Sequence, residues 1–437
     1  MTDAATLPRR AALDVLRRVR AGELADRALD AAAGGLSPRD RAWVQELVYG
    51  TLRLRGRIDH LLGALVRGGI DALEPDVLEV LRLGAYQLLE MGSVPHYAAI
   101  SQSQELVRAA GVGRAAGLVG GVLHALHRRH AEIAFPDPER DPLGYLSSWG
   151  SHPVWLVERW IRRWGADEAA ALVEANNRRP ELYIRPLGIG VEDAAARLAE
   201  AGIGAETVAF SPDSLQISPP AEVRQVLAAV PAVVQDPAAT LVVRYAAVPP
   251  GATVLDLCAA PGGKALALAE SAGYVVAADV APTRLARVRE NAARVELEGG
   301  VAPVAADARR PPFRPAEVVL LDAPCTGTGT IRRHPDGRWR LHPGDLDALT
   351  RLQRELLDAA APLVQPGGWL VYSTCALEPE ENELQVESFL ERHPEFTPDP
   401  AAGAVDPALL DARGQLLVLP QRTGADGSFA ARLRRRS

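Results

Sequence analysis

The sequence of 437 residues is poor in cysteine and lysine and has no long apolar run. Its three cysteines, Cys258, Cys325 and Cys375, are too few for a disulfide framework, and their spacing matches no zinc site. No stretch reaches the ~18 consecutive apolar residues of a membrane-spanning helix, and the N-terminus lacks the basic and then apolar pattern of a secretory signal. We therefore expect a cytoplasmic protein with reduced thiols that binds neither a metal ion nor a membrane.

The chain also has no surplus of positive charge; its formal net charge is −7. This balance disfavours a protein that holds nucleic acid by bulk attraction. Arginine is nevertheless clustered, and a local cluster can bind phosphates, although a solvated helix face explains any single cluster equally well; the clusters lie at 9–20, 128–129, 332–333 and 432–436. Among 48 basic residues the only lysine is Lys264, in a glycine-rich turn, which favours a site that needs a slim and flexible point charge.

The spacing of apolar residues divides the chain into three regions. Apolar positions recur every three or four residues up to about residue 132, which predicts an all-α domain over 1–135, followed by a Pro/Asp-rich linker. Residues 143–235 mix helical and alternating patterns and predict a small α+β module. Over 236–437, apolar strands alternate with helices, which predicts an α/β domain with a doubly wound, mostly parallel sheet.

Polar residues and thiols follow the predicted strands of the third region. The stretch DLCAAPGGK (256–264) reads as a strand, a tight glycine turn and a helix start, but it matches neither a dinucleotide fingerprint nor a phosphate loop. Asp279 ends the next strand, and Asp307 ends the one after it. An acid at the second strand end typically accepts hydrogen bonds from ribose hydroxyls. The pattern predicts a nucleoside-containing cofactor without a pyrophosphate, and a helix cap is the alternative for either aspartate alone.

Three motifs carry a resemblance to a known family. VLDLCAAPGGK (254–264), LLDAPCTGTG (320–329) and VYSTCALEPEEN (371–382) resemble motifs I, IV and VI of the S-adenosylmethionine-dependent RNA cytosine-5 methyltransferases. The stretch at 36–62 is similar to the NusB-like domain of the RsmB (Sun) branch, which methylates small-subunit ribosomal RNA. The resemblance covers nearly the whole chain and implies a NusB-like domain, a small α+β subdomain and a Rossmann-like methyltransferase domain.

The resemblance also implies roles for individual residues. Carbon 5 of cytosine becomes nucleophilic enough to accept a methyl group once a thiolate has added to carbon 6. Cys375 is implied as that nucleophile and Cys325 as the group that assists product release, with Asp322 near the N3 edge of the base and Lys264 at the base or its phosphate. The residues implied to bind S-adenosylmethionine, with Asp279 at the ribose and Asp307 at the adenine, are Cys258, Ala259, Ala260, Pro261, Gly262, Gly263, Lys264, Asp279, Arg284, Asp307 and Asp322.

The expected substrate is flexible or unpaired RNA, most directly ribosomal RNA, because the base must leave its stack to enter a pocket. We expect residues 327–339 to form a mobile loop in which Arg332, Arg333 and Trp339 grip the RNA, although a plain surface loop is an equally good interpretation for Trp339. We expect a monomer. One alternative is an RNA-binding or antitermination-type factor with an idle methyltransferase scaffold, and another is methylation of a different RNA such as tRNA. DNA methylation is disfavoured by Cys375 and by the NusB-like region.

Overall fold

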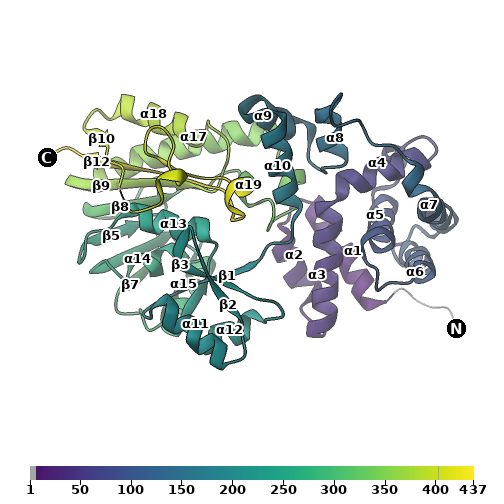
Figure 1. The fold of residues 1–437 in the computed structure, drawn as a ribbon, viewed down its shortest axis with the longest axis horizontal. Helices are drawn as coiled ribbons and strands as arrows, with labels where there is room; N and C mark the ends of the chain where they lie inside the picture. Colours follow the sequence, from purple (N-terminus) through teal and green to yellow (C-terminus); the bar gives the residue numbers. More distant parts are fainter. Residues whose placement is uncertain (1–5, 402) are drawn as a thin grey trace. The chain divides into compact units, whose positions relative to one another are not determined.

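The computed structural model describes residues 6–401 and 403–437, which form two compact units. The first unit runs to Arg178 and includes Ile331–Leu341, and the second comprises Arg179–Thr330 and His342–Ser437 (Figure 1). The boundary between the units, after Arg178, lies inside the segment 143–235 that was expected to form the α+β module. The helices of that segment before residue 178 belong to the first unit by their contacts. Within the described ranges, no helix combines the length and apolar character needed to cross a membrane.

The described residues of the first unit form helices and no strands, as the apolar spacing predicts for residues up to 135. Ser37 and Pro38 start the third helix, because the Ser37 side chain accepts a hydrogen bond from the Asp40 amide and Pro38 occupies the first turn. The α-helices of this unit are α1 (Leu7–Arg20), α2 (Ala25–Ala33), α3 (Pro38–Arg53), α4 (Arg55–Leu65), α5 (Pro75–Glu90), α6 (His96–Ala109), α7 (Ala116–Arg129), α8 (Pro142–Ser148), α9 (Val154–Trp164), α10 (Ala166–Asn177) and α16 (Gly337–Arg340).

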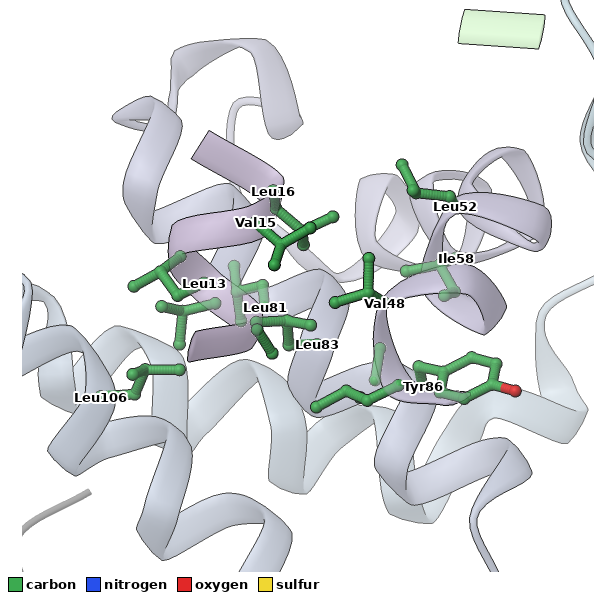
Figure 2. Packing of buried hydrophobic residues seen from close by; sticks show 14 of the residues in the cluster. Leu13, Val15, Leu16, Val48, Leu52, Ile58, Leu81, Leu83, Tyr86 and Leu106 are labelled. Atoms are coloured by element: carbon green, nitrogen blue, oxygen red, sulfur yellow. The ribbon is translucent and has the colours of Figure 1, made fainter. Parts of the chain in front are cut away.

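Side chains from α1, α3, α4, α5 and α6 converge on one core in this unit. Figure 2 shows Leu13, Val48, Ile58, Leu81 and Leu106 among its members, one from each of these helices. All five are at most 3% exposed. Each helix therefore buries the apolar stripe that the three- and four-residue spacing predicted.

The crossing of α3 and α5 depends on a glycine. A Cβ added at Gly50 would lie 1.9 Å from Cζ of Tyr86, whose hydroxyl donates a 2.7 Å hydrogen bond to Glu46. We expect Gly50→Ala to lower the free energy of unfolding of the helical unit by about 1–3 kcal/mol, because the Tyr86 ring must shift. Gly63→Ala is the matched control: Gly63 lies inside α4 with no atom within 4 Å of the added Cβ, so we expect a gain of roughly 0.5–1 kcal/mol there. Urea unfolding of both variants measures the contrast, and equal stability would contradict it.

The segment Ile331–Leu341 corrects one expectation. It is packed into the helical unit rather than exposed as a surface loop: Arg332 is 3% exposed and Arg338 is 0% exposed, whereas Arg333 is partly exposed. Arg338 donates hydrogen bonds of 2.8–3.2 Å to the carbonyls of Arg53, Ser151 and Asn176 and to the Asn177 side chain.

The tryptophan of this segment is held as well. The Trp339 indole donates a 2.6 Å bond to the Leu52 carbonyl, and its ring packs against the helical core. The sequence predicted exposed arginines here because the carbonyl groups that accept their hydrogen bonds belong to residues far away in the chain.

The second unit begins with a small four-stranded antiparallel sheet in the order β2-β3-β1-β4. Leu215 of β3 and Ile184 of β1 pair in register, and both pack with Leu198 in a core that the helices cover. This is the expected α+β module, built from β1 (Leu182–Pro186), α11 (Val191–Glu200), β2 (Ala205–Val208), β3 (Ser211–Ile217), α12 (Val223–Ala229) and β4 (Ala232–Val234).

An eight-stranded, mostly parallel sheet follows and confirms the predicted fold class. Strands β9-β8-β5-β6-β7 are parallel, whereas β10, β11 and β12 add antiparallel pairings at the β9 edge that the sequence pattern did not reveal. The elements are α13 (Pro237–Ala246), β5 (Thr253–Asp256), α14 (Gly263–Leu268), β6 (Tyr274–Asp279), α15 (Pro282–Arg294), β7 (Val301–Ala305), β8 (Ala316–Asp322), α17 (Pro343–Ala360), β9 (Val364–Thr374), α18 (Glu383–Arg392), β10 (Phe396–Pro398), β11 (Leu416–Val418), α19 (Pro420–Thr423) and β12 (Ser428–Arg435).

The alternation of side chains assigns each sheet residue to a face. Val254 and Leu320 pack with α13, α14 and α15 on one face, and Leu255 and Val319 pack with α17 and α18 on the other. A period of two therefore places Asp256 of β5 and Asp322 of β8 on the α14 face, at the carboxyl end of the parallel strands. Ligands bind at this end of doubly wound sheets.

Candidate active site

The turn after β5 is tied to the end of β6 by Asp279, which is 2% exposed. Its carboxylate accepts hydrogen bonds from the amides of Ala260 (3.3 Å) and Ala281 (2.8 Å) and from the guanidinium of Arg284 (2.7 Å). Gly262 has φ +106°, and a Cβ there would lie 3.1 Å from the Val288 side chain. The glycine is therefore needed for both its backbone conformation and its close packing on α15.

A cavity of about 450 Å³ lies against this turn and the neighbouring strand ends. Six of the residues predicted to bind cofactor line it, namely Cys258, Ala260, Asp279, Arg284, Asp307 and Asp322. Ala259, Pro261, Gly262, Gly263 and Lys264 are not among the lining residues; the first three form the turn itself, and Gly263 and Lys264 begin α14. Leu352 and Leu356 of α17 supply an apolar wall that the sequence did not single out, because they look like ordinary core positions of a helix.

Asp307, which lines the cavity, forms an ion pair with Arg309. Arg309 donates hydrogen bonds of 2.7–3.1 Å to its carboxylate, and this pairing lowers the pKa of Asp307 to about 2. The carboxylate is therefore ionised at any physiological pH. Together with Asp279 and Asp322 it makes the cavity rich in acceptors, which suits a ligand with hydroxyl groups and positive charge.

Lys264 and Asp322 form an ion pair beside the thiols. Lys264 Nζ lies 2.7 Å from Asp322 Oδ2, and Ser373, the partner of Asp322 in the β8–β9 register, donates a 2.7 Å bond to Oδ1. Burial disfavours the charge on Lys264, but Asp322 outweighs it and raises the pKa of the ammonium above its usual value. The lone lysine thus contacts a second residue of the predicted site, Asp322, and Ser373 is a neighbour of Asp322 that sequence reasoning missed.

Asp256 is a second carboxyl on this face that sequence reasoning left without a role. It is 1% exposed, and neither oxygen has a hydrogen-bond partner among the described residues. Burial, with the nearby charge of Asp322, raises the pKa of Asp256 to about 8. It is therefore mostly protonated and neutral at pH 7.

The thiols of Cys325 and Cys375 lie 3.3 Å apart, although fifty positions separate them in the chain. The hydrogen bond from Cys325, with the charge of Lys264, lowers the pKa of Cys375 below its usual value. The same hydrogen bond, together with burial, raises the pKa of Cys325 well above its usual value. One thiol is thus prepared to become a thiolate while the other keeps its proton.

Cys258 lies apart from this pair, in the wall of the cavity. Burial and the neighbouring carboxylates raise the pKa of its thiol, which disfavours a thiolate there. Among the residues described, no three histidine, cysteine or acidic side chains are grouped so that they could hold a metal ion. The arrangement therefore offers two thiols in hydrogen-bond contact, with a thiolate favoured at Cys375 over Cys325, and a carboxylate–ammonium pair next to an acceptor-rich cavity.

Family models match three stretches of the chain. The description "16S rRNA methyltransferase RsmB/F" matches residues 245–434, the NusB family matches 6–128, and the ferredoxin-like domain of RsmF/B-like methyltransferases matches 152–224. The three matches follow one another in the order of the regions predicted from apolar spacing.

Curated relatives and a solved structure cover nearly the whole chain. Ribosomal RNA small subunit methyltransferase B of Vibrio cholerae is 36% identical over 94% of this chain and 93% of its own, and that of Cronobacter sakazakii is 34% identical over 91% of each. The crystal structure of PH0851 superposes with a TM-score of 0.80, at 29% identity and 98% coverage of both chains. The chain therefore belongs to the RsmB/F family of 16S ribosomal RNA methyltransferases, enzymes that methylate RNA with S-adenosylmethionine as the cofactor.

Proposed function

We propose that the protein transfers a methyl group to carbon 5 of a cytosine in small-subunit ribosomal RNA through a covalent adduct with Cys375. The observation that carries the proposal is the thiol pair at the ends of β8 and β9, beside the Lys264–Asp322 ion pair. Two cysteines with opposite pKa displacements are what a nucleophile and a partner that stays protonated require.

The cavity suits S-adenosylmethionine, which supplies an electrophilic methyl group on a positively charged sulfur. Its volume of about 450 Å³ lies in the range of ~300–1,000 Å³ typical of small-molecule sites. We assign Asp279 to the ribose hydroxyls, because its carboxylate lies at the end of the second strand, and Asp307 to the adenine end. The backbone from Cys258 to Lys264 would follow the methionine end, and Arg284 would keep Asp279 oriented through its 2.7 Å ion pair.

In this mechanism the Cys375 thiolate adds to carbon 6 of the cytosine ring, and the electron pair of the C5–C6 double bond becomes available at carbon 5. After carbon 5 has gained the methyl group, its proton must leave and the bond between sulfur and carbon 6 must break, which restores the double bond. Cys325 lies 3.3 Å from the departing sulfur and can give it a proton, and the Cys325 thiolate that this leaves can take up the proton lost from carbon 5, so that Cys325 is restored as well. The free thiol of Cys375 is thereby regenerated.

Asp322 would act at the N3 edge of the cytosine. Its carboxylate is held from two sides by Lys264 and Ser373, so its orientation is set before the base arrives. A carboxyl group that shares a proton with N3 withdraws electrons from the ring and makes carbon 6 a better acceptor for sulfur. Lys264 can supply positive charge to the same region.

Removal of the Asp279 carboxylate should weaken cofactor binding. We expect Asp279→Ala to raise the dissociation constant for S-adenosylmethionine about 10- to 100-fold, since a hydrogen bond to a charged group contributes roughly 1.5–3 kcal/mol. Asp279→Asn should lose less, because one acceptor oxygen remains for the Ala260 and Ala281 amides. Isothermal titration calorimetry measures both, with Glu290→Gln on the exposed side of α15 as the control. An unchanged dissociation constant for Asp279→Ala would refute this assignment.

The alternative function is RNA binding with an idle methyltransferase scaffold. The lowered pKa of Cys375 favours catalysis instead, because a thiol that serves packing alone gains nothing from activation. Bisulfite sequencing of ribosomal RNA from a strain that lacks this gene separates the two: we expect one or a few cytosines to lose protection. If every ribosomal cytosine that is protected in the parent strain stays protected in the deletion strain, the ribosomal substrate is wrong, and the same method applied to tRNA tests the other RNA class.

A further inference from the structure

The residues next to Cys325 and Cys375 are hydrogen-bonded to one short buried segment of the chain. Motif VI ends in the stretch Glu378–Asn382, directly before α18, and the mechanism above leaves this stretch without a role. Glu381 and Asn382 are both 0% exposed. A buried carboxylate and a buried amide next to each other cost free energy unless their hydrogen bonds are made.

The Glu381 side chain holds the loop of Cys325. Its Oε1 accepts a 2.9 Å hydrogen bond from the amide of Thr326, the residue after Cys325, and its Oε2 accepts one from the Thr326 hydroxyl. Oε1 also accepts a 2.9 Å bond from Gln353, whose same amide group donates to the carbonyl of Pro324, the residue before Cys325. Both neighbours of Cys325 are therefore tied, directly or through Gln353, to one carboxylate.

The Asn382 side chain holds the loop of Cys375 in the same way. Its Oδ1 accepts a 2.5 Å hydrogen bond from the hydroxyl of Thr374, the residue before Cys375. Its Nδ2 donates a 2.9 Å bond to the carbonyl of Ala376, the residue after Cys375. The two cysteines, which come from different strands, are thus flanked by residues bound to two consecutive side chains of the chain.

We propose that Glu381 and Asn382 are positioning residues that set the distance between the two thiols and thereby activate Cys375. Glu381 and Asn382 are neighbours in the chain, directly before α18. The loop of Cys325 and the loop of Cys375 are therefore both anchored to the same short segment. Burial raises the pKa of Glu381 although Thr326 and Gln353 donate hydrogen bonds to it, so its ionised form is costly to bury and is better explained by what it positions. The negative charge also favours the protonated form of the neighbouring Cys325 thiol, which then donates to Cys375.

The direct test is alkylation of Cys375 in the full chain without RNA or cofactor. The rate of labelling by iodoacetamide, followed by mass spectrometry of the peptide that contains Cys375, reports the thiolate population. We expect Glu381→Gln to lower this rate about tenfold at pH 7, because the Cys325 loop loses its anchor and the hydrogen bond between the thiols weakens. Asn382→Asp should also lower it, since the bond to the Ala376 carbonyl is replaced by repulsion. Glu380→Gln, one residue earlier and partly exposed, is the matched control and should label as the wild type does.

A double substitution distinguishes positioning from general weakening of the fold. In a Cys325→Ala background, we expect Glu381→Gln to have no further effect on Cys375 labelling, whereas Asn382→Asp should still lower it. Labelling at the wild-type rate in Glu381→Gln and Asn382→Asp, whatever their melting temperatures, would overturn the proposal. If Asn382→Asp does not fold, the Glu381→Gln result decides the outcome alone.

This inference rests on the proposed function, because positioning Cys375 matters only if Cys375 is the nucleophile. The labelling experiment itself needs neither RNA nor methyl transfer. If Cys375 labelling responds as expected while Cys375→Ala still methylates RNA, the positioning role stands and the covalent mechanism is wrong. If Cys375 proves essential but its labelling is unaffected by the substitutions, the mechanism stands and the positioning role is wrong. Turnover gives a further readout, since kcat should fall in the Glu381 and Asn382 variants with little change in the KM for RNA.

Discussion

A Cys325→Ala protein mixed with substrate RNA and S-adenosylmethionine is expected to accumulate a covalent protein–RNA adduct, and a Cys375→Ala protein is expected to form none. The reason is the division of labour between the thiols: Cys375 can add to the ring without Cys325, but release of the sulfur then lacks the nearby proton donor. Denaturing electrophoresis with labelled RNA measures the adduct. Methylation should fall in both variants, by at least about 10³-fold for Cys375→Ala, since the loss of a nucleophile typically removes most of the rate enhancement.

Cys258→Ala is the matched control for this experiment. Its thiol lies in the cavity wall and its pKa is raised, so we expect no adduct to accumulate in this variant, whereas its affinity for S-adenosylmethionine can change. An adduct with Cys375→Ala but not with Cys325→Ala would reverse the assigned roles. An adduct with neither, in proteins that still methylate, would exclude the covalent route.

A second large effect is expected in the pH dependence of stability of the second unit. The pKa of Asp256 is about 8 in the folded protein and about 3.9 in an unfolded chain, so between these values the folded state holds a proton that the unfolded state has released. Stability therefore falls as the pH rises from 4 to 8, by up to ~1.4 kcal/mol per pH unit, and levels off above the folded pKa. Asp256→Asn removes this contribution, so the variant should gain several kcal/mol on the wild type between pH 5 and pH 8.

Hydrogen exchange of the β5 and β8 amides at pH 5 and at pH 8 measures the change in stability within the second unit. Glu317→Gln is the control, because its exposed carboxylate accepts a bond from the Thr253 amide near the opposite end of the same strands. An equal pH slope for the wild type and Asp256→Asn would mean that Asp256 ionises freely. A smaller but distinct gain would indicate that the folded pKa lies closer to the ordinary range.

Periodicity determined the class of each region, because apolar spacing is a local property of the chain. The three- and four-residue spacing predicted the helical unit, and the alternation of strands and helices predicted the parallel sheet. The antiparallel strands β10, β11 and β12 escaped prediction. They are short or rich in arginine, and they pair with β9 or with one another in a way that no local apolar pattern specifies.

The loop after Cys325 shows how local chemistry can mislead. Arg332, Arg333 and Trp339 predicted an exposed grip for RNA, yet Arg338 is fully buried and bound to carbonyls from residues 53, 151 and 176. Burial of arginine requires acceptors that are distant in sequence, and a sequence window cannot supply them. Other arginines of the predicted phosphate clusters are also paired, since Arg17 and Arg20 contact Asp76.

By itself, the sequence determined the fold class and the family and named the candidate reactive groups, because motifs I, IV and VI carry them as contiguous strings. Only the tertiary structure decided that the two thiols lie 3.3 Å apart, that Lys264 pairs with Asp322, and that Glu381 and Asn382 hold the neighbours of each cysteine. The physical reason is that pKa values depend on burial and on charges within a few ångströms. Those distances arise when strands β5, β8 and β9 end at one edge of the sheet.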